Sequence, residues 1–304
     1  MDKRGKNVLI FSIIFLLTVS FVSAGVLDFI RDLPNLITGR ATSATTSLNI
    51  TVGNAAPTVG SVVTIPSQSV TESGLTAVAF TFTASDTDGV GNLNDASAEA
   101  SFYNPAEELR TNLSCNWLSD LDTTTANYSC TVELWYWDGS GTYTVHANIS
   151  DINGAKGAND TTQFSLSETT AMVMAPNSLA WTSLSLTSTD QKSSSNPIKV
   201  NNTANKDITA GNVKVTAINL GGETTPSDYL LVDTFSVNTA DACEGTPMVN
   251  GTATAVSGST ITAGNNTAGS GSEDLYFCVE SVTGGISSQA YSTTNTGAWT
   301  VGVS

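Results

Sequence analysis

The sequence has few basic residues and almost no histidine, and these shortages exclude several classes of function. Of its 304 residues, 11 are Lys or Arg and 27 are Asp or Glu, so the formal net charge is −16. Nucleic-acid binding is disfavoured, because cationic side chains that neutralise phosphates supply most of that affinity. His146 is the only histidine. A metal site built from several histidines is therefore excluded, and a histidine-based catalytic triad would depend on this one residue.

Cysteine is also scarce, and its spacing excludes two further classes. The four cysteines, Cys115, Cys130, Cys243 and Cys278, form no C-x-x-C motif, which disfavours zinc ribbons and thioredoxin-like redox chemistry. An even number of cysteines in an exported chain indicates disulfides. We expect nearest-in-sequence pairing, Cys115–Cys130 and Cys243–Cys278. The alternative is four buried free thiols.

Charge is replaced by small polar residues, and helical periodicity is absent after residue 40. Ser and Thr make up 82 of the 304 residues, whereas charged residues are 12%. Apolar and polar residues alternate with period two in many short runs, which is typical of strands in β-sandwiches. The sequence therefore predicts an all-β protein with two tandem Ig-like β-sandwich domains. The expected strands lie near residues 46–52, 77–83, 143–149, 181–186, 198–200, 213–218, 275–279 and 299–303.

The first 45 residues carry an export signal. Lys3, Arg4 and Lys6 precede an apolar run that ends at Val22-Ser23-Ala24, so residues 1–24 are predicted to be a signal peptide. Residues 7–27 carry no charge, and they are long enough to serve as a retained membrane anchor instead. A third alternative is a prepilin-like leader cut after Gly5. Residues 25–45 are predicted to form a short amphipathic segment and a linker, so that residues 7–38 could contact a membrane.

We place the two expected domains at residues 46–167 and 168–304. The first block closes with a strand-like run at residues 163–167, a less regular stretch follows to residue 177, and each block holds one cysteine pair. The strand at 46–52 is expected to be the first strand of the first domain. Alternatively, because it follows a flexible linker, it could pair with the sheet edge of a neighbouring molecule.

Two motifs carry a resemblance to a known group of proteins. Residues 84–90 are Ala-Ser-Asp-Thr-Asp-Gly-Val, and residues 139–154 combine a Gly-Thr-Tyr-Thr-Val strand with an Asp-Ile-Asn-Gly turn. Residues 50–167 thereby resemble the immunoglobulin-like and PKD-like repeats of archaeal and bacterial surface proteins. In the second block, residues 200–205 are more weakly similar to a strand and turn of other secreted sandwich domains. The resemblance implies a fold and leaves activity open.

One loop is rich in the oxygen ligands that calcium prefers. Five side chains lie within ten residues: Asp86, Asp88, Asn92, Asn94 and Asp95. They could hold Ca²⁺, although their spacing is not that of an EF-hand. The alternative is turn chemistry alone, because Asp and Asn favour turns by accepting hydrogen bonds from their own backbone.

Two tryptophans suggest a glycan contact. Trp135 and Trp137 share one face of an expected strand, and exposed aromatic rings in a row can stack on sugars. The alternative is packing, because aromatic residues in strands usually bury their rings. His146 is expected to face solvent, opposite the apolar row of its strand.

Sequons for N-glycosylation are numerous but uninformative. Eight occur, at Asn49, Asn112, Asn127, Asn148, Asn159, Asn201, Asn250 and Asn265. A chain of this composition would carry about seven by chance, so they show no selection for glycosylation.

The sequence as a whole predicts an exported, non-enzymatic protein of a prokaryotic cell surface, with a structural or adhesive role and no catalytic residues or obligate cofactor. Its expected partners are other surface proteins, glycans or copies of itself. The alternatives are a carbohydrate-binding module and a pilin-like or strand-exchanging filament subunit.

Overall fold

A computed structural model describes residues 47–264, 270–282 and 284–304. The chain divides into two units, residues 1–53 and 54–304. The expected signal peptide or anchor, the amphipathic segment and the sequon at Asn265 lie outside the described residues. Within the described part, no helix combines the length and apolar character that a bilayer crossing requires.

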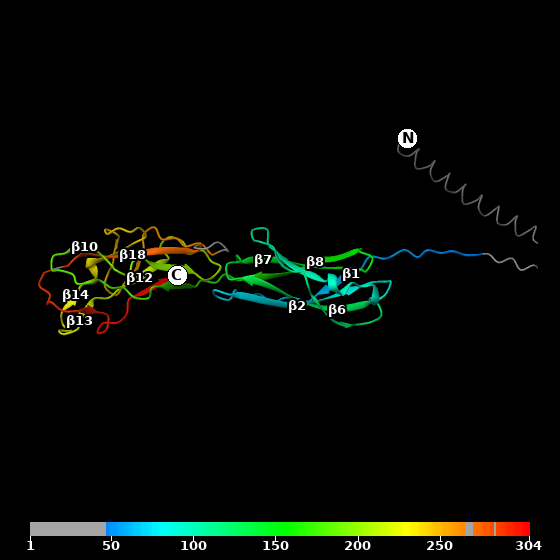
Figure 1. Cartoon of the computed structure of the whole chain (residues 1–304), viewed down its shortest axis with the longest axis horizontal. Coiled ribbons are helices and arrows are strands. Elements are labelled where there is room, and N and C mark those ends of the chain that lie inside the picture. The colour runs from blue at the N-terminus through cyan, green and yellow to red at the C-terminus, as the bar shows by residue number, and fades with distance from the viewer. Residues whose placement is uncertain (1–46, 265–269, 283) are drawn as a thin grey trace, which may run out of the picture. The chain divides into compact units, whose positions relative to one another are not determined.

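The described chain is built almost entirely from antiparallel β-strands (Figure 1), which confirms the all-β prediction. Its first eight strands are β1 (Thr58–Val62), β2 (Leu75–Ser85), β3 (Glu99–Tyr103), β4 (Arg110–Asn112), β5 (Asn116–Asp120), β6 (Thr125–Trp135), β7 (Gly141–Ser150) and β8 (Lys156–Leu166). The next twelve are β9 (Met172–Ala175), β10 (Thr189–Lys192), β11 (Ile198–Asn202), β12 (Val213–Thr216), β13 (Leu220–Gly222), β14 (Tyr229–Leu230), β15 (Phe235–Asn238), β16 (Thr246–Pro247), β17 (Ala253–Ala255), β18 (Ser272–Ser281), β19 (Tyr291–Ser292) and β20 (Thr300–Val303). Within the described ranges there are also three 3-10 helices, at Val90–Asn92, Asp95–Ser97 and Val232–Thr234.

Two four-stranded sheets share the first hydrophobic core. Their strand orders are β1-β2-β6-β5 and β4-β3-β7-β8. The alternation that predicted β2 also determines its packing, since Phe80 and Phe82 are buried while the residues between them are more exposed. The ring of Phe80 lies 5.7 Å from that of Phe102 in the other sheet. We call the buried cluster between Val59 and Leu166 the N-terminal core.

Three further sheets, one of six strands and two of three, surround a second hydrophobic core. Their orders are β16-β15-β18-β11-β9 (with β10 also on β18), β17-β12-β20 and β14-β13-β19. Apart from β18, with ten residues, these strands are two to five residues long. We call the buried cluster between Ile198 and Val282 the C-terminal core.

Each core is accompanied by one disulfide. Cys115 pairs with Cys130 beside β5 and β6, and Cys243 pairs with Cys278 of β18. The described residues include no free cysteine. The predicted nearest-in-sequence pairing is therefore confirmed. Disulfides of this kind are typical of oxidising compartments outside the cytoplasm.

Two expected strands do not form. Residues 47–57 contain no strand, and the side chains of Leu48, Ile50 and Val52 are largely exposed. The expectation that 46–52 begins the first sheet pair is wrong, because β1 starts only at Thr58. Residues 181–186 also form no strand, although Trp181 and Leu184 pack against the C-terminal core. In both places the alternation is present, but the segment has no neighbouring strand within the described chain to complete its hydrogen bonds.

Candidate functional site

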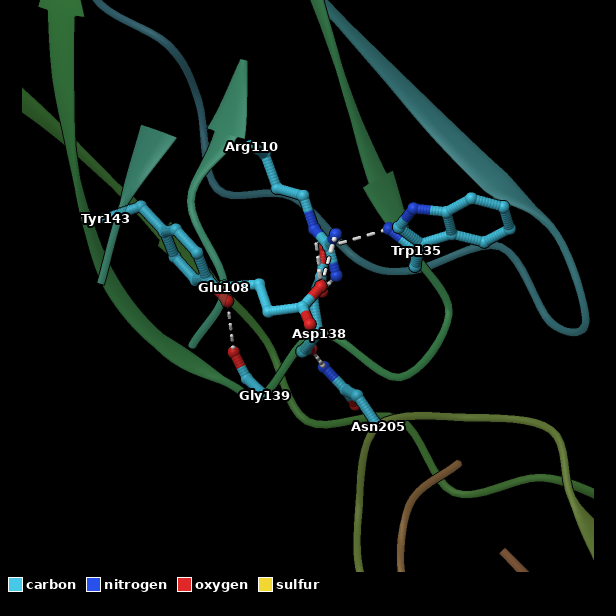
Figure 2. Close-up of polar contacts among 7 residues, drawn as sticks. All are labelled: Glu108, Arg110, Trp135, Asp138, Gly139, Tyr143 and Asn205. Carbon is cyan, nitrogen blue, oxygen red and sulfur yellow. Dashed lines mark hydrogen bonds and ion pairs between the residues drawn. The ribbon is translucent and has the colours of Figure 1, made fainter. Parts of the chain in front are cut away.

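A buried ion pair lies at one end of the N-terminal core. Arg110 begins β4, and Asp138 lies in the turn that follows β6. The Arg110 Nε donates to Asp138 Oδ1 at 3.1 Å and to Oδ2 at 2.9 Å, and an end nitrogen of the same guanidinium also donates to Oδ1. The Asp138 side chain is fully buried, whereas that of Arg110 is 12% exposed. Figure 2 shows this pair at the centre of a small polar network.

The surrounding groups complete the hydrogen bonding of the pair. The backbone N–H of Trp135 donates to Asp138 Oδ2 at 2.8 Å, and the exposed Glu108 accepts from Arg110 at 3.1 Å. Burial by itself would lower the pKa of Arg110, but the hydrogen bonds and charges of Asp138 and Glu108 outweigh it, and the pKa is raised. Arg110 therefore stays charged, which a buried ion pair requires.

Asn205 links this network to the region of the C-terminal core. Its Nδ2 donates to the carbonyl oxygens of Asp138 and Ser167, at 3.0 Å each, and its Oδ1 accepts from the N–H of Thr169 at 2.7 Å. The Asp138–Asn205 contact is drawn in Figure 2. The side chain thus ties the β6–β7 turn, the end of β8 and the segment after β11 together.

A buried tyrosine closes the network. The hydroxyl of Tyr143 donates to the carbonyl of Gly139 at 2.9 Å. Burial, together with the negative charges of Asp138 and Glu107, raises the pKa of Tyr143 far above its usual range. The phenol therefore stays protonated and acts as a fixed donor. Together these hydrogen bonds join β4 and β7 to the turn between β6 and β7.

The residues expected to bind calcium separate into two groups. Asp86 and Asp88 share one turn, in which Asp86 Oδ1 accepts the N–H of Asp88 at 2.8 Å and Asn92 Nδ2 donates to the Asp88 carbonyl at 2.7 Å. Asp95 instead accepts the hydroxyl of Tyr128 at 2.6 Å, and Asn94 bonds through its backbone to Ser150. The expected set of five therefore does not surround one point.

Two residues that the sequence did not single out, Asn54 and Ala55, lie beside the Asp86–Asp88 turn. Asn54 Nδ2 donates to Asp151 Oδ2 at 2.6 Å, and the next N–H, of Ala55, donates to Asp88 Oδ2 at 2.7 Å. Asn54 and Ala55 thus lie against both the Asp86 turn and the Asp151 turn. The hydrogen bond from Asn54 is the main reason that the pKa of Asp151 is lowered.

One oxygen of this loop region stands out. Asp86 Oδ2 is buried and accepts no hydrogen bond from any described residue. Yet no group of three or more His, Cys, Asp or Glu side chains in the described ranges is placed to hold a metal ion. Calcium at this loop therefore stays a prediction.

Trp135 and Trp137 do lie together, but they stack on each other. Their ring centroids are 4.6 Å apart with an interplanar angle of 12°, and Tyr136 meets Trp137 edge to face. Trp135 is 38% exposed. One face of each indole is therefore covered by the other, and the predicted glycan contact would use the outer surface of the pair.

His146 lies on the side of β7 that the sequence predicted, opposite the apolar row. It points away from the buried row of Tyr143, Val145 and Ala147 in β7, and its ring meets that of Tyr103 edge to face at 5.9 Å. This contact supplies no base–nucleophile pair.

A groove on the C-terminal core was not predicted. It has a volume of about 1100 Å³ and is bordered by residues 179–186 and 286–293, with Trp299 at its wall. We call it the C-terminal groove. Its walls come from segments about 100 residues apart in the sequence, and no local pattern predicts that they lie together.

No family model matches this chain, and no curated protein and no solved structure matches it either.

Proposed function

We propose that this protein is exported and acts at a prokaryotic cell surface as a non-enzymatic structural or adhesive protein. In this proposal the N-terminal and C-terminal cores are those of two tandem Ig-like β-sandwich domains. The observation that carries it is the presence of two disulfides, one beside each core. Disulfides persist in oxidising compartments, so they favour an exported protein. Two β-cores that each have their own disulfide suit a protein that presents its domains to its surroundings.

The chemistry of the described residues supports a non-enzymatic role. The most buried charged pair, Arg110 with Asp138, is fully hydrogen-bonded, and His146 faces away from the core. A catalytic site needs a nucleophile or base that is positioned beside a partner and open to a substrate.

Proteolytic shaving of intact cells tests this proposal. A surface protein releases peptides from residues 54–304 before lysis, and its cysteines resist alkylation until a reductant is added. Mass spectrometry of the mature N-terminus then identifies the attachment. A chain that starts at Gly25 is secreted, one that starts at Lys6 is pilin-like, and one that keeps residues 1–27 is anchored. Recovery only after lysis, with freely alkylated cysteines, would refute export.

A second candidate function is glycan binding at the tryptophan pair. Trp135 is partly exposed beside Trp137, and indole faces stack well on sugar rings. A polysaccharide that quenches tryptophan fluorescence in the natural protein, but not in a Trp135→Ala variant, would support this role. A flat response across a glycan panel would argue against it.

A further inference from the structure

The sequons of this chain carry no information by number, but they differ in where the folded protein places them. A sequon joins an acceptor Asn to a Ser or Thr two residues later, and it is used on the surface of secreted proteins. The attached saccharide is bulky and needs open solvent. Seven of the eight sequons, all but Asn265, lie in the described residues. Their Asn side chains can therefore be compared by exposure and by hydrogen bonding.

Three sequons use the side-chain nitrogen of Asn to hold strands together. Asn159 Nδ2 donates to two carbonyls of β1, at 2.6 and 3.3 Å, and Asn112 Nδ2 donates to a carbonyl of β6 at 2.8 Å. Asn148 Nδ2 donates to the carboxylate of Glu99 at 3.4 Å. All three Asn side chains are partly buried. A saccharide replaces one of the two N–H groups of the amide, so it would compete with these contacts.

Two further sequons lie inside sheets. Asn127 is in β6, between β2 and β5, and Asn201 is in β11, between β18 and β9. Both side chains are partly buried, and each residue is paired with a strand on either side. A saccharide at either position would have to lie across the neighbouring strands. The folded protein therefore disfavours attachment at all five of these partly buried sequons.

Asn250 has the opposite environment. It lies in the turn between β16 and β17, and Asn250, Gly251 and Thr252 are all exposed. The Oδ1 of Asn250 accepts the N–H of Asn219 at 3.0 Å, whereas its Nδ2 donates to no described residue. The oxygen end of the amide is therefore held against the protein, and the nitrogen end is left to solvent. This nitrogen is the atom to which a saccharide is attached.

The backbone of the turn fixes this presentation. The N–H of Gly251 donates at 2.8 Å to the carbonyl of Ala217, a buried residue of the C-terminal core. The N–H of Thr252 donates to the carbonyl of Val249 at 3.0 Å. Gly251 has a φ of 68°, a conformation that favours glycine. The hydroxyl of Thr252 bonds to no described residue, so the second element of the sequon is also open to solvent.

We propose that Asn250 carries an N-linked saccharide. The donor is of the class of oligosaccharides joined through the anomeric carbon to a lipid phosphate. Nδ2 of Asn250 forms a bond to the anomeric carbon, the bond from that carbon to the phosphate oxygen breaks, and the lipid phosphate leaves with the electron pair. One amide proton passes to a base of the transferase, and the other stays on the linking nitrogen. Asn49, which is also exposed, is the second position at which we expect a saccharide.

The proposal rests on the export proposed above, because sequons are used in secreted proteins. Two variants of Thr252 test it without changing Asn250 or its hydrogen bond to Asn219. Thr252→Val keeps the shape of the side chain but removes the hydroxyl that the sequon requires, whereas Thr252→Ser keeps the hydroxyl. Thr252 is exposed and belongs to neither core, so both variants should fold.

Glycopeptide mass spectrometry of the full-length protein from its natural host measures the result. No Lys or Arg follows Lys214, so a protease other than trypsin is needed. Fragmentation that keeps the sugar on its residue separates Asn250 from Asn265. We expect a saccharide on Asn250 in the natural protein and in Thr252→Ser, and its complete loss from Thr252→Val. Peptides that contain the five partly buried sequons should have the mass of the bare sequence.

Three outcomes would overturn the saccharide proposal: a bare Asn250 in protein recovered from the cell surface, a saccharide that stays on Asn250 in Thr252→Val, or saccharides at the partly buried sequons and none at Asn250. Proteolytic shaving measures export separately. A surface protein with a bare Asn250 refutes the saccharide alone. A protein that carries the saccharide but is recovered only after lysis refutes the surface location alone, and one that is recovered only after lysis with a bare Asn250 refutes both.

Discussion

The two cores of this chain are built from similar residues but are closed to different degrees. Around the N-terminal core, β2, β6, β7 and β8 have ten or eleven residues each, and they pair along almost their whole length. Around the C-terminal core, only β18 is that long. A long ladder buries a continuous row of side chains, while short strands leave gaps between sheets. In this chain, strand length is therefore more important than apolar content for covering a core.

The large aromatic side chains show the same difference. Tyr128, Tyr143, Phe82 and Phe102 are fully buried in the N-terminal core. In the C-terminal core, Trp181 and Trp299 pack on Phe235 but also line the groove. Both indoles are therefore only partly buried.

The largest expected loss of stability follows removal of the Cys243–Cys278 disulfide beside the C-terminal core. A double Cys243→Ala, Cys278→Ala variant opens a loop of 35 residues, which in the chain-entropy model costs about 4 kcal/mol of stability. The short strands around the C-terminal core have little to offset this loss. We expect hydrogen exchange followed by mass spectrometry to show that this core exchanges readily while the N-terminal core stays protected.

The matched control is the double Cys115→Ala, Cys130→Ala variant. Its loop has 15 residues, so the expected loss is about 3 kcal/mol. Because the long ladders remain, we expect the N-terminal core to keep its slow exchange. If hydrogen exchange were equally slow in both cores of both variants, the two cores would not differ in how well their strands protect them.

The next largest loss of stability is expected when the buried ion pair between Arg110 and Asp138 is broken. Asp138→Asn keeps the shape of the side chain but leaves Arg110 with only the exposed Glu108 as its counter-charge, and breaking a buried pair costs about 3 kcal/mol. The control is Glu108→Gln, which removes the exposed partner of the same Arg110 and should cost under about 1 kcal/mol. Denaturant unfolding monitored by fluorescence compares them. Similar losses in the two variants would show that the pair is not buried in solution.

Asn205 should have a smaller but more specific effect. Asn205→Ala removes the hydrogen bonds to Asp138 and Ser167 and should cost about 1–2 kcal/mol. Because these bonds link the two cores, the variant should separate their unfolding into two transitions in calorimetry. Lys206→Ala, which removes a neighbouring exposed ion pair with Glu168, should leave the profile of the natural protein. A single shifted transition in Asn205→Ala would mean that the cores are coupled by other contacts.

Much of the fold follows from local patterns in the sequence. The period-two rows of β2, β7 and β18 were predictable because each row needs only its own residues to define a buried face. The disulfide pairing was predictable because the nearest partners lie 15 and 35 residues apart. The segments at 47–52 and 181–186 carry the same pattern and still form no strand. Alternation specifies what a strand would bury, but it does not specify which strand will pair with it.

The polar network around Arg110 and Asp138 could not be predicted from the sequence, for a related reason. Arg110 meets Asp138 across 28 residues, and Asp138 meets Asn205 across 67. Such contacts depend on the sheet register, which no local pattern contains. One signal was present, since Arg110 is the only arginine after Arg40. A single arginine in a chain so poor in bases is a good candidate for a buried ion pair.

The smallest expected effect concerns acid stability, and it should fall on the N-terminal core alone. The hydrogen bond from Asn54 lowers the pKa of Asp151 below its usual range. A carboxylate with a lowered pKa in the folded state contributes stability above its unfolded pKa of about 3.9. That contribution is lost as the pH falls through the folded value. Asn54→Ala removes the main cause, so the variant should differ from the natural protein at pH 6 and converge with it at low pH.

Thermal unfolding at a series of pH values measures this difference. Asn153→Ala is a suitable comparison, because its side chain bonds to Asn54 and not to Asp151. It should change the pH dependence less than Asn54→Ala does. Both variants should leave the transition of the C-terminal core in place, because Asn54 and Asp151 contact only turns of the N-terminal sheets. A pH-dependent shift of the C-terminal transition in Asn54→Ala would show that the N-terminal core also stabilises the C-terminal core.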